Sequence, residues 1–316
     1  LNLATDKIIP HCQNLAEAMH KHGAKFMIQI THMGGRSRWD GDHWPTLMSP
    51  SGIREPVHRA TCKTIGPEEI WRVIGNYASA AARAKAGGLN GVELSAVHQQ
   101  MVDQFWSPRG NRRTGEWGGS FENRMRFGLE VIKAVRKEVG PDFCVGLRIC
   151  GDEFHPDGLS HEDMKEIAKY YDQTGMIDFI GVVGSGCDTH NTLANVIPNM
   201  SYPPEPFLHL AAGIKEVVKV PVLHAQNIKD PNQATRILEG GYVDMVGMTR
   251  AHIADPHLIA KIKVGQIDQI KQCVGANYCI DRQYQGLDVL CIQNAATSRE
   301  YMGVPHIIEK TTGVKR

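Results

Sequence analysis

The sequence predicts an α/β fold in which helices cover a parallel β-sheet. Six short runs rich in Val, Ile, Leu and Phe recur along the chain with helical patterns between them, at residues 25–30, 89–95, 143–149, 177–183, 220–224 and 243–248. These runs are apolar without a clean alternation, which is typical of strands buried on both faces. Because strand and helix alternate regularly, we expect parallel strands with the helices outside the sheet.

The helical patterns between these strands carry recognisable start and stop signals. Pro67 and the two glutamates after it suit the first turn of a helix, where a missing N–H costs nothing and negative charge meets the helix dipole. Ser160 and Asp163 resemble a capping box that opens a later helix. The glycine pairs at 87–88 and 240–241 are expected to end helices, because glycine tolerates a left-handed backbone.

Composition excludes several classes of function. The 316 residues carry a formal net charge of +1, which gives no electrostatic case for nucleic acid or a membrane surface as a partner. No apolar run approaches the roughly 20 residues that a spanning helix requires. Five of the eight cysteines are scattered, which suits reduced thiols in a cytoplasmic protein. The chain is long enough for one α/β barrel or for two domains.

The segment from 98 to 124 is the longest connection between predicted elements. It follows the strand at 89–95 and precedes the helical pattern that starts at Met125. Loops of this length are uncommon in compact α/β proteins and are usually functional. Since substrates bind at the carboxyl ends of parallel strands, we expect ligand-binding residues here. Its two tryptophans argue against a merely solvated loop.

Both a barrel and an open doubly wound sheet fit the alternation of strands and helices. Six strands alone would leave two long apolar edges unpaired in a barrel fragment. The residues after the first strand, 28–36, do not supply the Gly-x-Gly-x-x-Gly fingerprint of a dinucleotide-binding sheet, which disfavours that alternative. From about Gln272 the α/β rhythm stops, and a cysteine-bearing tail follows.

Several segments in a shared order resemble the Old Yellow Enzyme family, in the longer branch that includes trimethylamine dehydrogenase, dimethylglycine demethylase and 2,4-dienoyl-CoA reductase. Any one segment alone would be a weak signal, but their order and spacing together are strong. The segments are residues 29–36, 80–88, 104–108, 111–114, 118–124, 146–148, 244–250, 253–256 and 273–279.

The resemblance implies a TIM (β/α)8 barrel that holds FMN at the carboxyl ends of its strands. It also implies that this chain begins after the first two strands of the barrel and stops before the dinucleotide-binding domains of the longer relatives. We therefore expect an FMN-binding barrel over 1–271, lacking its first strands, and an iron–sulfur-type cysteine segment with a linker over 272–316.

Three residues are predicted to bind the flavin phosphate. In a barrel of this class, phosphate sites lie after the seventh and eighth strands, which would be the runs at 220–224 and 243–248. The loops after these runs contain Gln226, Gly247 and Arg250. Backbone N–H groups and the Arg250 guanidinium would form the site, and the family places an arginine with this role at the position of Arg250. The alternative is a surface arginine at a helix start.

Two further residues are predicted to contact the flavin ring. Arg148 ends a buried strand, where an unpaired charge would be expensive. It resembles the family arginine that faces the N1–O2 edge of the flavin. Gln29 matches the family amide that binds the pyrimidine edge, although an amide on a strand could equally be a satisfied core residue.

The substrate site is predicted around His98, which matches the substrate histidine of the family. The family places a second polar residue three positions earlier, and this residue is Ser95 here. Ene-reductases of the family carry a proton-donating tyrosine where this chain has Gln100, whose amide is not a useful acid at neutral pH. Asp188 falls near the sequence position where the amine dehydrogenases of the family carry an acidic residue. The alternative is that Asp188 is an ordinary loop aspartate.

Cys273, Cys279 and Cys291 resemble three of the four ligands of the [4Fe–4S] cluster in this branch. The position of the second ligand is Ala276. Four thiolates are the usual requirement for a cubane cluster. The alternatives are a three-iron cluster, a cluster with an outside ligand, or three buried thiols without a metal, and we expect a lost or incomplete cluster.

These features predict an FMN-dependent oxidoreductase that removes a methyl group from a small N-methylated amine such as dimethylglycine. The alternatives are an NAD(P)H-dependent enoate or 2,4-dienoyl-CoA reductase on the same scaffold, and a non-catalytic barrel subunit of a larger complex. Gln100 disfavours the first alternative, and Arg148 with Arg250 disfavours the second. We expect a flavoprotein or a nicotinamide as electron acceptor, and a homo-oligomer.

Overall fold

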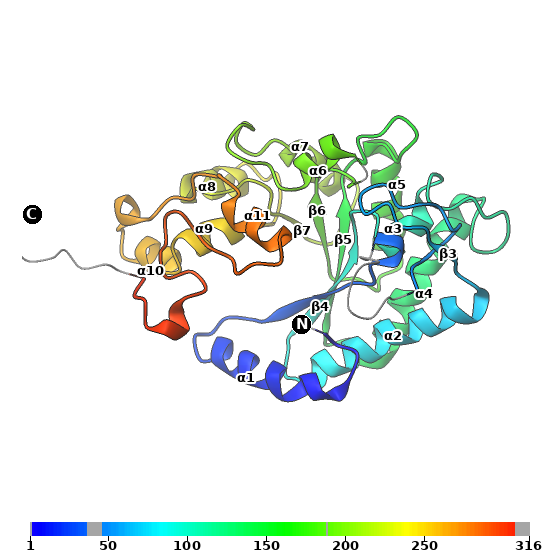
Figure 1. Ribbon diagram of the computed structural model, residues 1–316, viewed down its shortest axis with the longest axis horizontal. Coiled ribbons are helices and arrows are strands. Elements are labelled where there is room, and N and C mark those ends of the chain that lie inside the picture. The colour runs from blue at the N-terminus through cyan, green and yellow to red at the C-terminus, as the bar shows by residue number, and fades with distance from the viewer. Residues whose placement is uncertain (1, 37–45, 188, 307–316) are drawn as a thin grey trace, which may run out of the picture. The chain divides into compact units, whose positions relative to one another are not determined.

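The computed structural model describes residues 2–36, 46–187 and 189–306, and its main element is a sheet of six parallel strands (Figure 1). The strands are paired in the order β1-β4-β5-β6-β7-β8, which is also their order along the chain. Each predicted strand is present, so the predicted α/β class is confirmed. The strands are β1 Met27–Ile30, β4 Gly91–Ala96, β5 Cys144–Cys150, β6 Phe179–Val183, β7 Val222–His224 and β8 Met245–Val246.

A second, smaller sheet was not predicted from the sequence. Strands β2 (Met48–Ser49) and β3 (Lys63–Thr64) pair in parallel in the segment that connects β1 to the next long helix. Each strand has only two residues, so neither could show a periodic pattern. Backbone hydrogen bonds stabilise the turns in the segment between them. For example, Glu55 N donates to Ala60 O at 2.9 Å.

The chain divides into two compact units. The first comprises residues 1–196, 209–224 and 243–245, and the second comprises 197–208, 225–242 and 246–316. The predicted boundary between 1–271 and 272–316 stays a prediction. None of the helices within the described residues is both long enough and apolar enough to cross a membrane.

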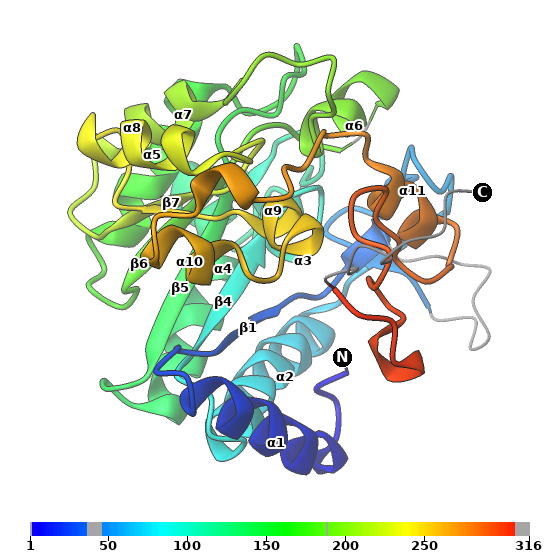
Figure 2. The ribbon, with the colours of Figure 1, turned by 90° about the vertical axis from the view of Figure 1, so that its left-hand side faces the viewer.

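The helices of the first unit cover its strands. Helices α2 and α4 pack against each other beside the sheet (Figure 1), and α1 lies along α2, below strands β1, β4, β5 and β6 (Figure 2). The predicted capping box is present: Ser160 Oγ accepts from Asp163 N, and the Asp163 carboxylate accepts from Ser160 N. The helices up to the end of this region are α1 Ile9–His20, α2 Pro67–Ala86, α3 Met101–Trp106, α4 Phe121–Val139, α5 His161–Asp172, α6 His190–Val196 and α7 Leu208–Lys215.

Part of the long segment from 98 to 124 belongs to the core instead of forming a loop. Its first third contains helix α3, in which Phe105 and Trp106 are fully buried. Trp106 Nε1 donates to Tyr171 Oη at 2.9 Å, and the Phe105 ring stacks on Phe127. The hydrophobic effect therefore fixes the segment to α4 and α5, and only the remainder is available for ligands.

The second unit is built from short helices joined by irregular segments. Its small apolar cluster includes Ala251, Leu258 and Ile270. The same unit contains a largely buried ion pair, in which Lys261 Nζ is 2.5 Å from Asp255 Oδ2. The helices are α8 Pro231–Glu239, α9 Thr249–Ala254, α10 Leu258–Lys263 and α11 Tyr278–Tyr284.

Candidate active site

A row of polar side chains crosses three neighbouring strands of the first unit. Gln29 on β1 is paired in register with Glu93 on β4, and its Nε2 donates to Glu93 Oε2 at 2.6 Å. Arg148 on β5 approaches the other carboxylate oxygen, with Nη1 3.5 Å from Glu93 Oε1. The two residues predicted to contact the flavin ring are therefore brought together by one carboxylate.

Sequence reasoning missed Glu93, although a signal was present. It is the one ionisable residue in the apolar run at 89–95, where an unpaired charge would be expensive. Gly181 on β6 leaves the space that the pair occupies, since a Cβ there would lie 2.5 Å from Glu93 Oε1. The pair is largely buried, with 20% of the Arg148 and 14% of the Glu93 side chain exposed.

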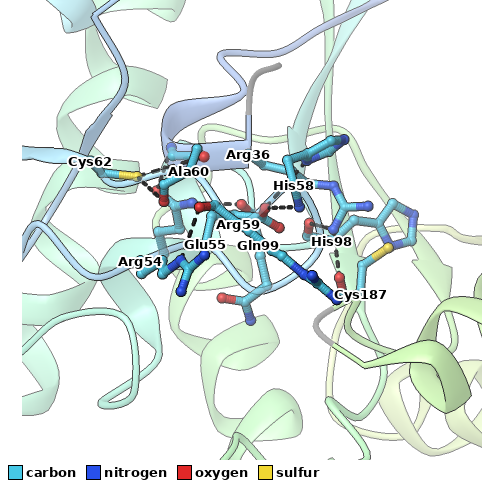
Figure 3. A network of polar contacts seen from close by, with 12 residues as sticks. Arg36, Arg54, Glu55, His58, Arg59, Ala60, Cys62, His98, Gln99 and Cys187 are labelled. Atoms are coloured by element: carbon cyan, nitrogen blue, oxygen red, sulfur yellow. Dashed lines mark hydrogen bonds and ion pairs between the residues drawn. The ribbon is translucent and has the colours of Figure 1, made fainter. Parts of the chain in front are cut away.

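His98 lies in a strained turn directly after β4. His98 and Gln99 both have φ of 62°, a left-handed conformation that costs an L-residue free energy. Hydrogen bonds with neighbouring side chains hold the turn. Gln99 N donates to Asp103 Oδ2 at 2.7 Å, and the buried Arg36 guanidinium donates from Nη1 to the carbonyl oxygens of His98 at 3.2 Å and Cys187 at 2.6 Å (Figure 3). Strain of this kind clusters at functional sites.

The His98 imidazole is neutral at physiological pH. Burial, together with the Arg148 and Arg36 cations, lowers the pKa of His98 to about 3. A neutral imidazole carries one N–H donor, which can bind the lone pair of an unprotonated amine, and it places no positive charge beside that amine. The buried Nδ1 of His98 has no hydrogen-bond partner within the described part of the chain.

Ser95 also presents an unsatisfied polar atom. It is fully buried on β4 in register with Arg148, and its Oγ has no hydrogen-bond partner among residues 2–36, 46–187 and 189–306. A buried hydroxyl without a partner costs about 1–3 kcal/mol, so such groups require an explanation. A bound molecule that donates to or accepts from Ser95 would remove this cost.

The Gln100 side chain is fixed by a hydrogen bond within the protein. Its side chain is buried, and its Oε1 accepts from Thr31 Oγ1 at 2.6 Å. An amide fixed in this way can orient a ligand but cannot donate a proton as a general acid.

Arg250 in the second unit is a desolvated cation without a carboxylate partner among residues 2–36, 46–187 and 189–306. It lies at the start of α9, and its guanidinium donates to Pro198 O at 2.7 Å, to Asn277 Oδ1 and to Asn227 Oδ1 at 3.4 Å. Burial lowers the pKa of Arg250. Within the described residues it forms no ion pair, so an anionic ligand would supply the missing counter-charge.

The two other residues predicted at the phosphate lie in the same unit. Gln226 is buried. Position 247 has no room for a side chain, because a Cβ on Gly247 would lie 2.7 Å from Ala225 Cβ. These loops therefore bring the backbone of 225–227 close to that of 247, which suits a phosphate cradle.

The three cysteines of the second unit are close enough to influence one another. Burial raises the pKa of Cys279, and the charges of Cys273 and Cys291 contribute to this shift. None of the three forms a disulfide. No group of three or more His, Cys, Asp or Glu side chains within the described chain is arranged to hold a metal ion. Because position 276 is alanine, the cysteine motif offers three thiolates where a cubane cluster usually has four, and iron binding by these cysteines stays a prediction.

The remaining predicted and motif residues separate into three groups. Asp188 lies outside the described residues. Asn111 and Arg113 serve the local structure: Asn111 Nδ2 donates to Phe105 O and Trp117 O at 2.8 and 2.6 Å, and Arg113 Nε donates to Pro50 O at 2.6 Å. Arg109 and Arg112, from the same motif, line a cavity.

Relatives of known activity resemble the chain along its whole length. It is 79% identical over 316 residues to an N,N-dimethylglycine/sarcosine dehydrogenase of Chromohalobacter salexigens, covering 100% of this chain and 46% of that protein. It is 40% identical over 317 residues to a multifunctional alkene reductase/demethylase OYE of Caballeronia cordobensis, covering 100% of this chain and 45% of that protein. The chain thus spans a little under half the length of these relatives.

A solved structure and a family comparison agree with these relatives. The structure of a 2-naphthoyl-CoA reductase with 2-naphthoyl-CoA matches with a TM-score of 0.88 and 28% identity, covering 95% of this chain and 47% of that chain. The matching structures are TIM barrels, which confirms the predicted class. Residues 1–269 match one family, and the chain therefore belongs to the NADH:flavin oxidoreductase / NADH oxidase family.

Proposed function

We propose that the protein uses FMN to oxidise a small N-methylated amine, with an N-methylated amino acid such as dimethylglycine as the substrate. The observation that carries the proposal is the neutral His98 beside Gln100. Oxidation of a C–H bond next to nitrogen needs an unprotonated amine, which a neutral imidazole can stabilise, and it needs no proton donor to carbon. The 79% identity to a dimethylglycine/sarcosine dehydrogenase supports the same substrate class.

Each unit, taken by itself, presents groups of the kind that bind a flavin mononucleotide. In the second unit, Arg250 has no counter-ion within the described part of the chain, and Gly247 allows a close backbone approach, as a phosphate requires. In the first unit, Gln29 and Arg148 offer amide and guanidinium donors, and Ser95 Oγ is unsatisfied in the described chain. When bound, FMN would accept a hydride from the N-methyl carbon.

The side chains of the first unit would prepare the amine for this transfer. His98, which its pKa of about 3 keeps neutral, would donate its imidazole N–H to the lone pair of the unprotonated amine nitrogen. Arg36 would hold the backbone of this turn in place through the His98 carbonyl. The oxidised substrate, an iminium, would hydrolyse to a secondary amine and formaldehyde.

Alkene reduction is the second candidate, because the Caballeronia relative carries both activities in its name. Reduction of a C=C bond needs a proton for the second carbon. Gln100, held by Thr31, cannot supply that proton. A non-catalytic barrel subunit is the third candidate, and the retained Arg148 and Arg250 argue against it. The electron acceptor, a cytoplasmic location and a homo-oligomer stay predictions.

An anaerobic substrate screen of the full-length protein tests the proposal. We expect dimethylglycine to bleach the flavin absorbance and to release about one formaldehyde per flavin reduced. An activated enone should not reoxidise the reduced flavin at a comparable rate. Reoxidation by enones without any bleaching by N-methylated amines would replace the proposal with the reductase.

A further inference from the structure

The carboxylate of Glu93 is shared between the two side chains that the proposed function assigns to the flavin ring. Strands β1, β4 and β5 are neighbours in the sheet, and each contributes one residue to this contact (Figure 2). One oxygen accepts from Gln29 Nε2 at 2.6 Å, and the other lies 3.5 Å from Arg148 Nη1. Gly181 on β6 leaves room for both charged groups, because a Cβ there would lie 2.5 Å from Glu93 Oε1 and 3.4 Å from Arg148 Nη1.

A structural role alone does not account for the negative charge of Glu93. Taking two charges out of water costs about as much free energy as their attraction returns, so a largely buried ion pair is weak evidence for stability. The 3.5 Å contact is also longer than the roughly 2.7–2.9 Å of a strong charge-assisted hydrogen bond. A neutral amide oxygen would satisfy Gln29 Nε2 as well as a carboxylate does. The charge therefore calls for a function other than holding the strands together.

The Arg148 guanidinium is compensated by Glu93 but not saturated with acceptors. It forms no further hydrogen bond with the residues that the structure describes, and 20% of the side chain is exposed. Burial and, after it, the Arg148 cation lower the pKa of His98, so the field of this guanidinium reaches the candidate active site. The remaining N–H groups of Arg148 can meet an acceptor of a ligand, and Glu93 determines how much positive charge that ligand experiences.

We propose that Glu93 sets the reduction potential of the bound flavin by partly neutralising the charge of Arg148. The inference rests on the proposed function, in which Gln29 and Arg148 supply donors to the FMN ring. A hydride that leaves the N-methyl carbon carries two electrons and one proton to the ring. The neutral oxidised ring then becomes an anion, and the amine becomes a cationic iminium.

The two side chains have opposite effects on this anion. The Arg148 cation stabilises it, whereas the Glu93 carboxylate destabilises it. Glu93 is thus a positioning residue that keeps the potential lower than Arg148 alone would. A lower potential lets the reduced ring release its two electrons to an acceptor more readily, which a dehydrogenase requires after each turnover.

The test measures the midpoint potential of FMN in the full-length holoenzyme, by slow reduction with dithionite beside a reference dye, so that no amine is needed. Glu93→Gln keeps an acceptor for Gln29 and removes the charge. We expect its potential to rise, so that the equilibrium constant between flavin and dye changes at least about tenfold, or about 30 mV for a two-electron couple.

Asp178→Asn is the matched control. Asp178 lies directly before β6 in the same unit and is also a carboxylate paired with an arginine, at 2.8 Å from Arg136 Nη2. Its side chain is 44% exposed, so water and salt screen its charge. The potential of this variant should equal that of the wild type.

Two further variants of Glu93 separate its charge from its structural contacts. Glu93→Asp retains the charge and should leave the equilibrium constant within about threefold of the wild type. Glu93→Met removes the charge without adding an amide, and its potential should rise as that of Glu93→Gln does. Thermal melts verify folding.

Reconstitution of the apoprotein covers any variant that loses its flavin during purification. The Kd of oxidised FMN and the Kd of reduced FMN are measured with excess flavin, and their ratio gives the shift in potential through a thermodynamic cycle. A purely structural role of Glu93 would weaken both redox states equally and leave this ratio unchanged. A role of its charge strengthens reduced FMN relative to oxidised FMN in Glu93→Gln.

Equilibrium constants of Glu93→Gln and Glu93→Met within about twofold of that of Asp178→Asn would overturn the inference, as would a lowered potential. Oxidation of dimethylglycine by the wild type is measured separately. Raised potentials without this oxidation would remove the proposed substrate and leave the role of Glu93. Oxidation of dimethylglycine with unchanged potentials would remove the role of Glu93 alone.

Discussion

The two compact units present their key arginines in opposite electrostatic settings. In the first unit, Arg148 lies on a strand and approaches the Glu93 carboxylate, which also binds Gln29. In the second unit, Arg250 lies at a helix start and is surrounded by one carbonyl and two amide oxygens. The first arginine is compensated within the protein, and the second lacks a counter-charge among the described residues.

This difference separates positioning from binding. A compensated guanidinium keeps its place whether or not a ligand is bound, so Arg148 is preorganised to polarise the edge of a ring. An uncompensated guanidinium carries a desolvation cost that an anion would relieve. Arg250 should therefore contribute more than Arg148 to the affinity for a ligand. Mutations can test this ranking.

The largest effect is expected from Arg250→Ala. Loss of the guanidinium should lower FMN affinity about 100-fold, because two charge-assisted hydrogen bonds to phosphate contribute about 1.5 kcal/mol or more each. The flavin-to-protein absorbance ratio after purification and the Kd from reconstitution of the apoprotein measure the change. Arg236→Ala is the control, since Arg236 is in the same unit but is exposed and paired with Glu205 at 2.6 Å. Unchanged flavin content in Arg250→Ala would show that the phosphate lies elsewhere.

The second effect concerns the cysteines of the same unit. Ala276 cannot ligate iron, so we expect fewer than four irons per chain in the unmodified protein. Ala276→Cys should raise the iron content and give the absorbance of a four-iron cluster after anaerobic reconstitution. Ala276→Ser, which adds a hydroxyl in place of a thiol, is the matched control. Four irons and four sulfides in the unmodified chain would contradict the prediction and require a further ligand.

A smaller effect is expected in the first unit from Gln100→Tyr. A phenol at this position would provide the proton that alkene reduction needs, and general acid catalysis contributes about 100-fold or more when the geometry is ideal. Since Gln100 is anchored to Thr31, we expect an imperfect geometry and about a tenfold gain in enone reduction. Gln100→Phe separates the hydroxyl from the ring. Fast enone turnover by the unmodified protein would contradict the argument.

The sequence predicted the strands of the sheet well, because buried parallel strands leave continuous apolar runs. It could not predict β2 and β3, since a strand of two residues is too short to show a periodic pattern. Helix α3 was also missed, because its aromatic residues were interpreted as part of a long loop. For the site, the family resemblance nominated His98, and positions after buried strands together with that resemblance nominated Arg148 and Arg250. The bridging role of Glu93 depends on the strand register, which sets Gln29 opposite Glu93 and Ser95 opposite Arg148. Register is a property of the folded sheet and is absent from a linear pattern.

The smallest effect is a pH dependence of stability that arises within the first unit. Burial, with the Arg148 and Arg36 cations, lowers the pKa of His98 to about 3, so between pH 6.5 and 3 the unfolded state binds a proton that the folded state refuses. Stability from this group is complete above pH 6.5 and falls as the pH decreases toward 3. Burial raises the pKa of Asp103 to about 8, and this acts in the opposite direction: stability falls as the pH rises from about 4 to 8.

The two contributions therefore oppose each other between about pH 4 and 6.5, and only Asp103 remains between 6.5 and 8. Asp103→Asn keeps an acceptor for Gln99 N and should remove the decline in stability from pH 6.5 to 8, by up to one proton or about 1.4 kcal/mol per pH unit. His98→Gln should instead remove the loss below pH 6.5. Urea denaturation from pH 4 to 8 measures both slopes, with Asp142→Asn as an exposed control. Identical slopes in Asp103→Asn and the wild type would show that Asp103 is ionised in the folded protein, and the electrostatic account of the His98 turn would then have to change.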